Sequence, residues 1–346
     1  MTRGISASIK TKAFHVYALI RVTTLRKFFN LLAIKTQRWL RVSRVRGMPY
    51  RYVIDPVNYC VLNCPLCPTG QKHLGRSAGK FPLERYKEII DVIAPYTYYL
   101  DLFNWGEPFL HPQIWDLIAY ASSRKILVRI SSNLNAFDNQ NAEKLVRSGL
   151  TDLLISLDGA DQATYESYRS GGSLEHVIAA ARAIIQAKAA LRSARPFVNV
   201  RMLVTRKNED KIHEVRQLAR DLGADVFSIA PIFINPSDQD AVNEWLPENP
   251  AYSCYDNKQG TYQVENVWSC ADLWEQMTIN WDGSVLPCCW LHKSEFDFGN
   301  VFTTPLPVVW NNDYYTNSRR VFSRQGPENT PRTVCIQCKG KPEFRY

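Results

Sequence analysis

The 346-residue sequence has no long uninterrupted hydrophobic run, and it has no acidic residue before Asp55. A membrane-spanning helix needs about 20 largely apolar residues, so no spanning segment is expected. The start also lacks a compact apolar stretch followed by small residues, which argues against a secretory signal peptide. Nine cysteines are too sparse for a disulfide scaffold, and their tight clusters suit metal binding in a reducing compartment. We therefore expect a cytoplasmic protein.

The basic charge is confined to the start of the chain. Residues 1–54 hold twelve Lys and Arg, whereas the remaining residues hold thirty basic and thirty-three acidic side chains. Within residues 1–50, Leu25, Phe29, Leu32 and Thr36 recur at helical spacing, which predicts one or two amphipathic helices. Three interpretations stay open for this segment. It contacts an anionic partner such as the inner face of a membrane, it packs against the enzyme body, or it is an organellar targeting segment.

From Tyr52 onward, short apolar runs alternate with helix-length segments. The predicted strands are Tyr52–Pro56, Tyr98–Phe103, Leu127–Ser131, Leu153–Leu157, Phe197–Val204 and Val226–Ile229. Six strand-helix units imply a parallel sheet, and six are too few for a closed eight-fold barrel. We therefore predict an α/β fold with a partial (β/α)6 parallel barrel over residues 51–240. Beyond residue 240 the alternation of strand-like and helix-like segments stops. Residues 241–346 are expected to form a small cysteine-rich domain stabilised by metal.

The first cysteine cluster follows the first predicted strand. Residues 60–67 read Cys-Val-Leu-Asn-Cys-Pro-Leu-Cys, which places Cys60, Cys64 and Cys67 within eight positions. Soft thiolates select zinc or an iron–sulfur cluster. Three thiolates leave one iron of a cubane cluster open, whereas a structural zinc would take a fourth ligand such as His73. Both interpretations are compatible with the residues alone.

This Cys-x3-Cys-x2-Cys loop after strand one resembles the radical S-adenosylmethionine (SAM) superfamily. The resemblance implies a [4Fe–4S] cluster on Cys60, Cys64 and Cys67 whose open iron binds SAM, from which a 5′-deoxyadenosyl radical forms. Further segments resemble the family's SAM contacts, although Trp105 stands where the first Gly of its Gly-Gly-Glu-Pro segment would be. The SAM-binding residues implied in this way are Gly106, Glu107, Pro108, Ser131, Asn133, Ser156, Asp158, Arg169 and Leu203.

A second cysteine set lies near the end of the sequence. Asp282-Gly283 predicts a hairpin turn that would return Cys288 toward Cys270, where a four-thiolate site can form with Cys335 and Cys338. This pattern is similar to the auxiliary-cluster domain called SPASM, or to its shorter twitch form. The sequence ends eight residues after Cys338, so one auxiliary [4Fe–4S] cluster is the expected number. Cys254 and Cys289 stay unassigned, although Cys289 could replace Cys288 as a ligand.

Three functions are compatible with these features. The leading hypothesis is a SAM-dependent radical oxidoreductase that removes hydrogen from a sugar, a polyol or a lipid-linked glycan, with flavodoxin or ferredoxin as electron donor. The alternative is a peptide maturase that forms thioethers or epimerises residues. A zinc-stabilised nucleic-acid-binding protein is the alternative from a different class, and no nucleic acid is expected in the first two cases. The sequence identifies no catalytic base, and the candidates considered are Tyr98, Asp101, His292 and Glu295.

Overall fold

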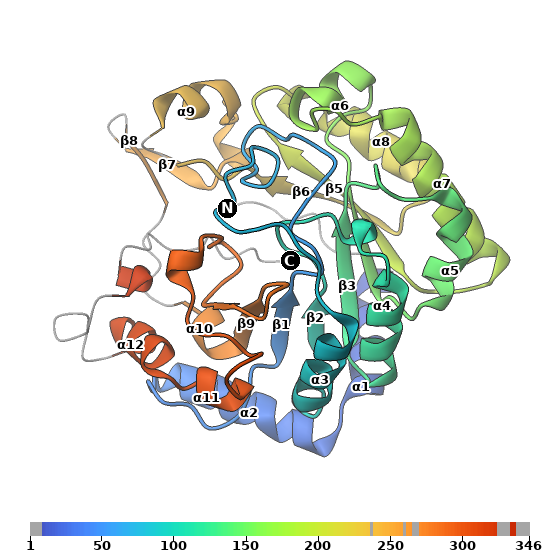
Figure 1. Cartoon of the computed structure of the whole chain (residues 1–346). Helices are drawn as coiled ribbons and strands as arrows, with labels where there is room; N and C mark the ends of the chain where they lie inside the picture. The colour runs from blue at the N-terminus through green and yellow to red at the C-terminus, as the bar shows by residue number, and fades with distance from the viewer. Residues whose placement is uncertain (1–8, 236–237, 259–260, 265–269, 324–332, 337–346) are drawn as a thin grey trace.

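A computed structural model describes residues 9–235, 238–258, 261–264, 270–323 and 333–336 (Figure 1). Its strands are β1 (Arg51–Ile54), β2 (Tyr99–Asp101), β3 (Leu127–Ser132), β4 (Asp152–Ser156), β5 (Phe197–Val204), β6 (Val226–Pro231), β7 (Tyr255–Lys258), β8 (Thr261–Val264), β9 (Gln276–Ile279) and β10 (Val285–Leu286). Its helices are α1 (Ile9–Val22), α2 (Leu25–Trp39), α3 (Leu83–Ile93), α4 (Ile114–Ser123), α5 (Ala142–Arg147), α6 (Gln162–Tyr168), α7 (Leu174–Ala190), α8 (Ile212–Leu222), α9 (Gln239–Trp245), α10 (Asp272–Glu275), α11 (Leu306–Val309) and α12 (Asp313–Val321).

The strands β1 to β6 lie side by side in chain order, and every neighbouring pair among them is parallel. Each is followed by at least one helix, as the alternating apolar runs predict. The curved sheet remains open, with β10 at one edge and β6 at the other. The predicted partial parallel barrel is therefore confirmed.

Local signals fix where several helices begin and end. The Ser173 side chain caps α7 by accepting a hydrogen bond from the His176 amide, and Asp161 caps α6 in the same way. Gly223 ends α8 in the left-handed conformation, with φ of 84°, which an L side chain rarely adopts. These short turns set each strand close to the next helix.

The C-terminal part of the chain also builds the sheet. Strand β9 pairs in parallel with β1, and the short β10 returns antiparallel to β9. Gly283, with φ of 79°, makes the turn between β9 and β10, so the predicted hairpin is present. A buried apolar cluster continues from the barrel strands into this region and includes Trp274, Trp310 and Tyr315. The division into domains at residue 240 stays a prediction, because the two parts share a sheet and a core.

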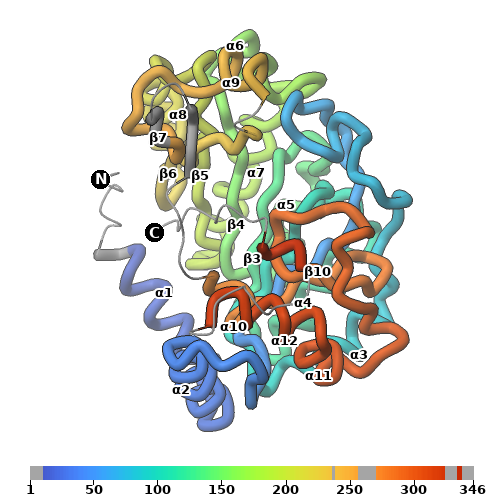
Figure 2. The backbone as a smooth tube through the Cα atoms, turned by 90° about the vertical axis from the view of Figure 1, so that its left-hand side faces the viewer, coloured from blue at the N-terminus to red at the C-terminus, as the bar shows by residue number. Residues whose placement is uncertain are grey.

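Helices α1 and α2 lie across the end of the barrel where the strands begin (Figures 1 and 2). Ala18 and Val22 of α1 pack against Tyr98 and Leu127, which stand at the start of β2 and β3. From α2, Lys35 and Arg38 form ion pairs with Glu275 in α10. One face of this helix pair thus packs on the body, as one of the three interpretations predicts. Neither helix, nor any other in the described residues, is long and apolar enough to span a bilayer.

Candidate active site

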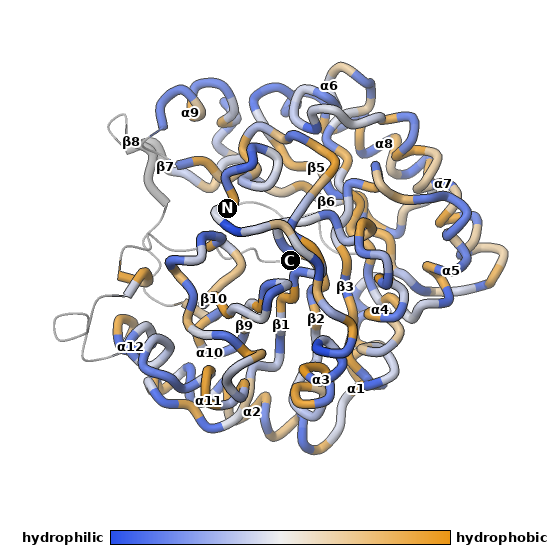
Figure 3. The backbone as a smooth tube through the Cα atoms, viewed as in Figure 1, coloured by the Kyte–Doolittle hydropathy of each residue, from blue (hydrophilic) through white to orange (hydrophobic). Residues whose placement is uncertain are grey.

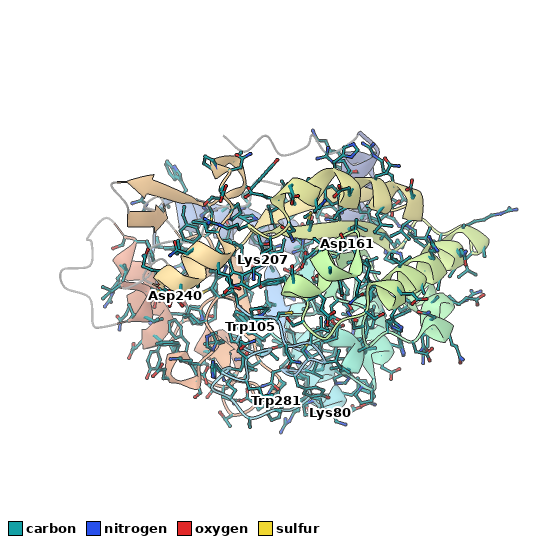
Figure 4. The ribbon with its side chains drawn as sticks, turned by 90° about the horizontal axis from the view of Figure 1, so that it is seen from above. Lys80, Trp105, Asp161, Lys207, Asp240 and Trp281 are labelled. Carbon is teal, nitrogen blue, oxygen red and sulfur yellow. The ribbon has the colours of Figure 1, made fainter. Side chains whose placement is uncertain are left out.

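A cavity of about 400 Å³ opens at the carboxyl ends of the parallel strands. Loops that follow β1 to β6 line it, because the ends of parallel strands meet at the same edge of a sheet. Figure 4 looks down on this side and shows Trp105 near the middle of the molecule. The C-terminal part closes one side through Cys289 and Trp290.

The three cysteines of the first cluster all line this cavity. Burial raises the pKa of the Cys60 thiol to about 11, and it also raises the pKa of Cys64. Thiols in such surroundings stay protonated unless a metal holds the thiolate form. The Cys60 sulfur accepts hydrogen bonds from the Leu62 amide and from Asn133 Nδ2, each at 3.4 Å. These donors are already arranged to stabilise a negative charge on that sulfur.

The donor set fits a cluster better than a single metal ion. Among the described residues, no three Cys, His, Asp or Glu side chains converge tightly enough to hold one ion. A structural zinc requires such convergence, whereas each thiolate of a cubane cluster binds a separate iron. The arrangement of Cys60, Cys64 and Cys67 around a cavity therefore favours the iron–sulfur interpretation over zinc with His73.

The segment after β2 packs directly on the start of the cysteine loop. A Cβ atom added to Gly106 would lie 1.8 Å from the Val57 carbonyl oxygen, so only glycine fits this close approach. The Glu107 amide donates to the Tyr59 carbonyl oxygen at 2.9 Å. The predicted SAM segment and the predicted cluster loop are therefore held against each other by backbone contact.

Glu107 is a buried carboxylate with three donors. It accepts hydrogen bonds from Ser132 Oγ at 2.7 Å, the Asn133 amide at 2.9 Å and the Phe109 amide at 3.2 Å. Burial raises the pKa of Glu107, and these hydrogen bonds oppose the rise. The carboxylate lines the cavity, where it can accept a further hydrogen bond from a bound cation such as the amino group of SAM.

Arg169 and Asp158 form a buried ion pair beside Cys64. Arg169 Nε donates to Asp158 Oδ2 at 2.5 Å, and the other carboxylate oxygen of Asp158 accepts from the Leu203 amide at 2.7 Å. The pair ties the end of β4 to the end of α6 and to β5. Arg169 also faces the cavity, so its planar fork can bind a ligand carboxylate.

The structure brings most of the predicted SAM residues to one cavity. The predicted residues in its lining are Gly106, Glu107, Ser131, Asn133, Ser156, Arg169 and Leu203. Pro108 and Asp158 lie outside the lining, where Pro108 begins a short 3₁₀ turn and Asp158 holds Arg169. The role in binding SAM predicted for Pro108, for Asp158 and for each lining residue stays a prediction.

Sequence reasoning missed Asp55, which lies at the end of β1 and is almost fully buried. Its carboxylate accepts hydrogen bonds from the Trp105 amide at 3.3 Å and the Gly106 amide at 3.4 Å. Burial raises its pKa to about 7, and the backbone donors oppose the rise. Its only signal in the sequence is an acidic residue directly after a strand. Ser132, which holds Glu107, was missed as well.

Three described members of the second cysteine set, Cys270, Cys288 and Cys335, lie outside the lining of the cavity. Burial raises the pKa of Cys270 to about 12 and also raises that of Cys288 well above its ordinary value. Negative charge on Cys335 also raises the pKa of Cys270, which indicates that these thiols are near one another. Cys338 lies outside the described residues. Cys289 differs from Cys288 because it lines the cavity, so Cys288 is the better placed ligand of the two.

Aromatic contacts join the second cysteine region to the barrel. The rings of Phe233 and Trp290 pack edge to face with centroids 4.0 Å apart. Trp105 packs edge to face on His292 and donates its indole N–H to the Leu291 carbonyl oxygen at 3.3 Å. Phe233, Trp290 and Trp105 all line the cavity, which gives its outer wall an aromatic character.

None of the four candidate bases lines the cavity. Asp101 forms a two-pronged ion pair with Arg129, and Tyr98 packs beneath α1 at the opposite end of the barrel. His292 is hydrogen-bonded to the Leu74 carbonyl oxygen, and Glu295 forms an ion pair with Lys293. Cavity position therefore favours none of them as the group that removes a proton.

Comparison with known proteins places this site in a family. Residues 54–219 match the model of the radical SAM superfamily, and residues 270–339 match the iron–sulfur cluster-binding domain SPASM. The chain belongs to the radical SAM superfamily. It is an enzyme whose cofactors are SAM, a [4Fe–4S] cluster and auxiliary iron–sulfur clusters of the SPASM domain. This membership supports the enzyme interpretation over that of a zinc-stabilised nucleic-acid-binding protein.

Particular relatives act in several pathways. The chain is 24% identical over 287 residues to an AdoMet-dependent heme synthase of Nitratidesulfovibrio vulgaris, a match that covers 72% of this chain and 76% of the relative. It is 23% identical over 305 residues to the antilisterial bacteriocin subtilosin biosynthesis protein AlbA of Bacillus subtilis, covering 84% and 65%. Its fold is similar to Streptococcus suis SuiB bound to precursor peptide SuiA, with 18% identity, a TM-score of 0.59 and coverage of 83% and 69%.

Proposed function

We propose that this enzyme is a maturase that modifies a side chain of a peptide or protein. The main support is the chemistry of the cavity wall. The polar groups of the wall are mostly those assigned above to the cluster and to SAM, and the remaining lining is largely apolar or aromatic and includes Ile232, Phe233, Trp290 and Trp105. Such a surface suits an apolar or aromatic side chain presented from outside.

The size of the cavity points in the same direction. A volume of about 400 Å³ is near the lower end of the range of about 300–1,000 Å³ that holds one drug-sized ligand. SAM and the cluster would fill most of it. A substrate would therefore insert only its reacting group, while its bulk stays outside. A peptide side chain satisfies this condition.

Oxidation of a small sugar or polyol, our leading hypothesis from the sequence, receives less support. A bound polyol would bury its hydroxyl groups, and burial of each hydroxyl costs free energy unless a polar group of the protein forms a hydrogen bond with it. Beyond the residues assigned to the cluster and to SAM, the polar side chains of the described wall are few and include Asn104, Tyr168 and Ser132, of which Ser132 already donates to Glu107. The names of the relatives AlbA and SuiB support a peptide substrate more than a sugar.

The bound cluster and SAM would supply the radical that removes a hydrogen atom. The residues of this chain would orient SAM and exclude water. Arg169 and Glu107 would bind its carboxylate and amino groups, and Trp105 and Trp290 would cover the reacting carbon. Residues 9–50 form two helices without a strand, so the described residues contain no N-terminal winged helix to bind a peptide. We infer that the substrate is recognised at the cavity opening.

The test is anaerobic incubation of the cluster-loaded enzyme with SAM and a library of short peptides, with sugars and polyols in parallel. We expect 5′-deoxyadenosine to form faster with particular peptides, together with a peptide product that has lost two hydrogens or gained solvent deuterium. Deuterium transfer from a labelled polyol, with no response to any peptide, would overturn the proposal and restore the oxidation hypothesis.

A further inference from the structure

Helix α2 differs from an ordinary surface helix, because its buried face is largely polar and its exposed face carries large apolar side chains. Its buried residues are Lys27, Asn30 and Ile34, of which two are polar. Lys27 Nζ donates to the Lys125 carbonyl oxygen at 2.5 Å, and burial lowers the pKa of Lys27 to about 8. Asn30 exchanges two hydrogen bonds of 2.9 Å with the backbone of Met48. Polar groups therefore fasten this helix to the body.

The outward face of α2 carries the large apolar side chains. Leu25 is 79% exposed, Phe29 is 62% exposed and Trp39 is 76% exposed. Residues at spacings of three, four and seven lie on the same side of a helix. The preceding helix α1 adds three exposed residues of the same kind. We define the apolar helix face as Val16, Tyr17, Ile20, Leu25, Phe28, Phe29, Leu32, Trp39 and Leu40, all of them exposed.

The charge around this face has one sign. No acidic residue occurs between residues 9 and 54, and Lys12, Arg21, Arg26, Arg41 and Arg44 are exposed. Figure 3 shows hydrophobic and hydrophilic residues alternating along α2 at the lower edge of the molecule. Aromatic and aliphatic side chains ringed by Arg and Lys match the boundary between lipid headgroups and acyl chains.

We propose that the apolar helix face binds the surface of an anionic lipid bilayer. Single exposed apolar residues are ordinary on a soluble protein, but nine on two adjoining helices call for a partner. The surrounding cations favour anionic lipid over a second copy of this chain, since two such faces would repel each other. Binding at the surface also agrees with helices that are too short and too polar to span the bilayer.

The position of this face determines the direction in which the active site opens. Helices α1 and α2 cover the ends where strands begin, whereas the cavity lies where strands end (Figures 1 and 2). A molecule bound through α2 would therefore turn its cavity away from the bilayer. Its substrate would arrive from the water and not from the lipid, which disfavours a lipid-linked glycan.

Vesicle co-sedimentation of the full chain tests the proposal. We expect the protein to sediment with vesicles that contain about one third phosphatidylglycerol, and not with phosphatidylcholine alone. The double substitution F28S/F29S should weaken binding at least about tenfold, because it removes two large apolar side chains from the face. The control V92S/V308S removes exposed apolar residues from α3 and α11 and should bind as the wild type does.

Each arm has an outcome that would overturn the proposal. Absence of wild-type binding to anionic vesicles would do so, as would equal binding by F28S/F29S. If the wild type forms a dimer that the F28S/F29S substitution dissociates, and if it does not bind vesicles, the face would instead be assigned to contact with a second copy of the chain. SAM cleavage by F28S/F29S in solution should stay at the wild-type rate, which shows that the variant is folded and that the face is separate from the active site.

The fluorescence of Trp39 reports how far the apolar helix face enters the bilayer. Lipids brominated in the acyl chain quench nearby tryptophans, so they should quench the wild-type protein when it binds. The substitution W39F keeps an aromatic group on the face and should keep binding while it removes most of the quenching. Unchanged quenching in W39F would show that Trp39 is not in the bilayer and would overturn the proposed orientation.

Discussion

The two ends of the barrel use buried and exposed groups in opposite ways. At the end where strands finish, polar groups such as Glu107 and Arg169 line a cavity, and the buried carboxylates of Asp55 and Asp158 lie behind them. At the end where strands begin, apolar groups such as Phe29 and Trp39 point outward. We propose that the polar groups at the first end bind a ligand and that the apolar surface at the second end binds a partner.

Both exceptions to ordinary burial lie where we propose that this chain binds other molecules. Buried polar groups cost free energy unless partners satisfy them, and large exposed apolar patches are rare on monomers. Between the two ends, the strands follow the usual rule, with Leu100, Val128 and Val198 fully buried. Breaking one end should therefore leave the other intact, and the predictions below test that independence.

The largest effect is expected at Cys64, which is buried and lines the cavity. The substitution C64A should abolish SAM cleavage, because the remaining two thiolates cannot hold the cluster with one open iron. Iron content should fall by about half if a second four-iron cluster stays bound. The control is C254A, which removes a partly buried thiol outside the cavity lining and should retain iron and cleavage. Retained SAM cleavage in C64A would refute its assignment as a ligand.

A large but smaller effect is expected at Gly106. The added methyl group of G106A would lie 1.8 Å from the Val57 carbonyl oxygen, so the loop must move by more than an ångström. Misplacement on this scale can cost about a hundredfold, and we expect SAM affinity to fall by that order in calorimetric titration. The variant G171A meets no atom closer than 3.7 Å, although its φ of 82° strains an alanine. G171A should lose stability and keep SAM affinity. Equal affinity in G106A and wild type would contradict the packing argument.

An intermediate effect is expected at Asp55. The variant D55N places an amide where the carboxyl group accepts the Trp105 and Gly106 amides, and we expect it to lose about 1–3 kcal/mol of unfolding free energy at mildly acidic pH. Denaturant titration of both proteins measures this loss.

The pH dependence at Asp55 has a definite sign. Its pKa rises from an ordinary value of 3.8 to about 7 in the folded protein, so folding takes up a proton between these values. Wild-type stability should therefore fall as pH rises through this window, relative to D55N, which cannot titrate. The stability advantage of the wild type over D55N should therefore narrow as pH rises from about 4 to 7. If the unfolding free energies of the two proteins change in parallel across this pH range, burial does not raise the pKa of Asp55.

The sequence was sufficient for the strands and for the cysteine loop, because their signals are local. Apolar runs bounded by turns predicted β1 to β6, and the spacing of Cys60, Cys64 and Cys67 predicted a metal site, which the family resemblance narrowed to an iron–sulfur cluster. It was not sufficient for the pairing of β9 with β1, because partners so far apart in sequence leave no periodic signal. Helical spacing revealed an apolar stripe on α2, but a stripe does not state whether it faces the core or the solvent.

The smallest effect is expected at the other end of the barrel, where His15 holds α1. Its Nε2 lies 2.7 Å from Asp152 Oδ1, and this hydrogen bond is the main reason that the pKa of His15 is raised above its ordinary value of 6.5. A raised pKa means that the stabilisation is complete below pH 6.5 and is lost as pH rises through the folded value. Hydrogen exchange in α1, corrected for intrinsic rates, should therefore accelerate modestly from about pH 6 to 8. The variant D152N should show fast exchange at both pH values, and SAM cleavage should be unaffected because the pair lies outside the cavity lining. A pH effect that persists in D152N would assign it to another group.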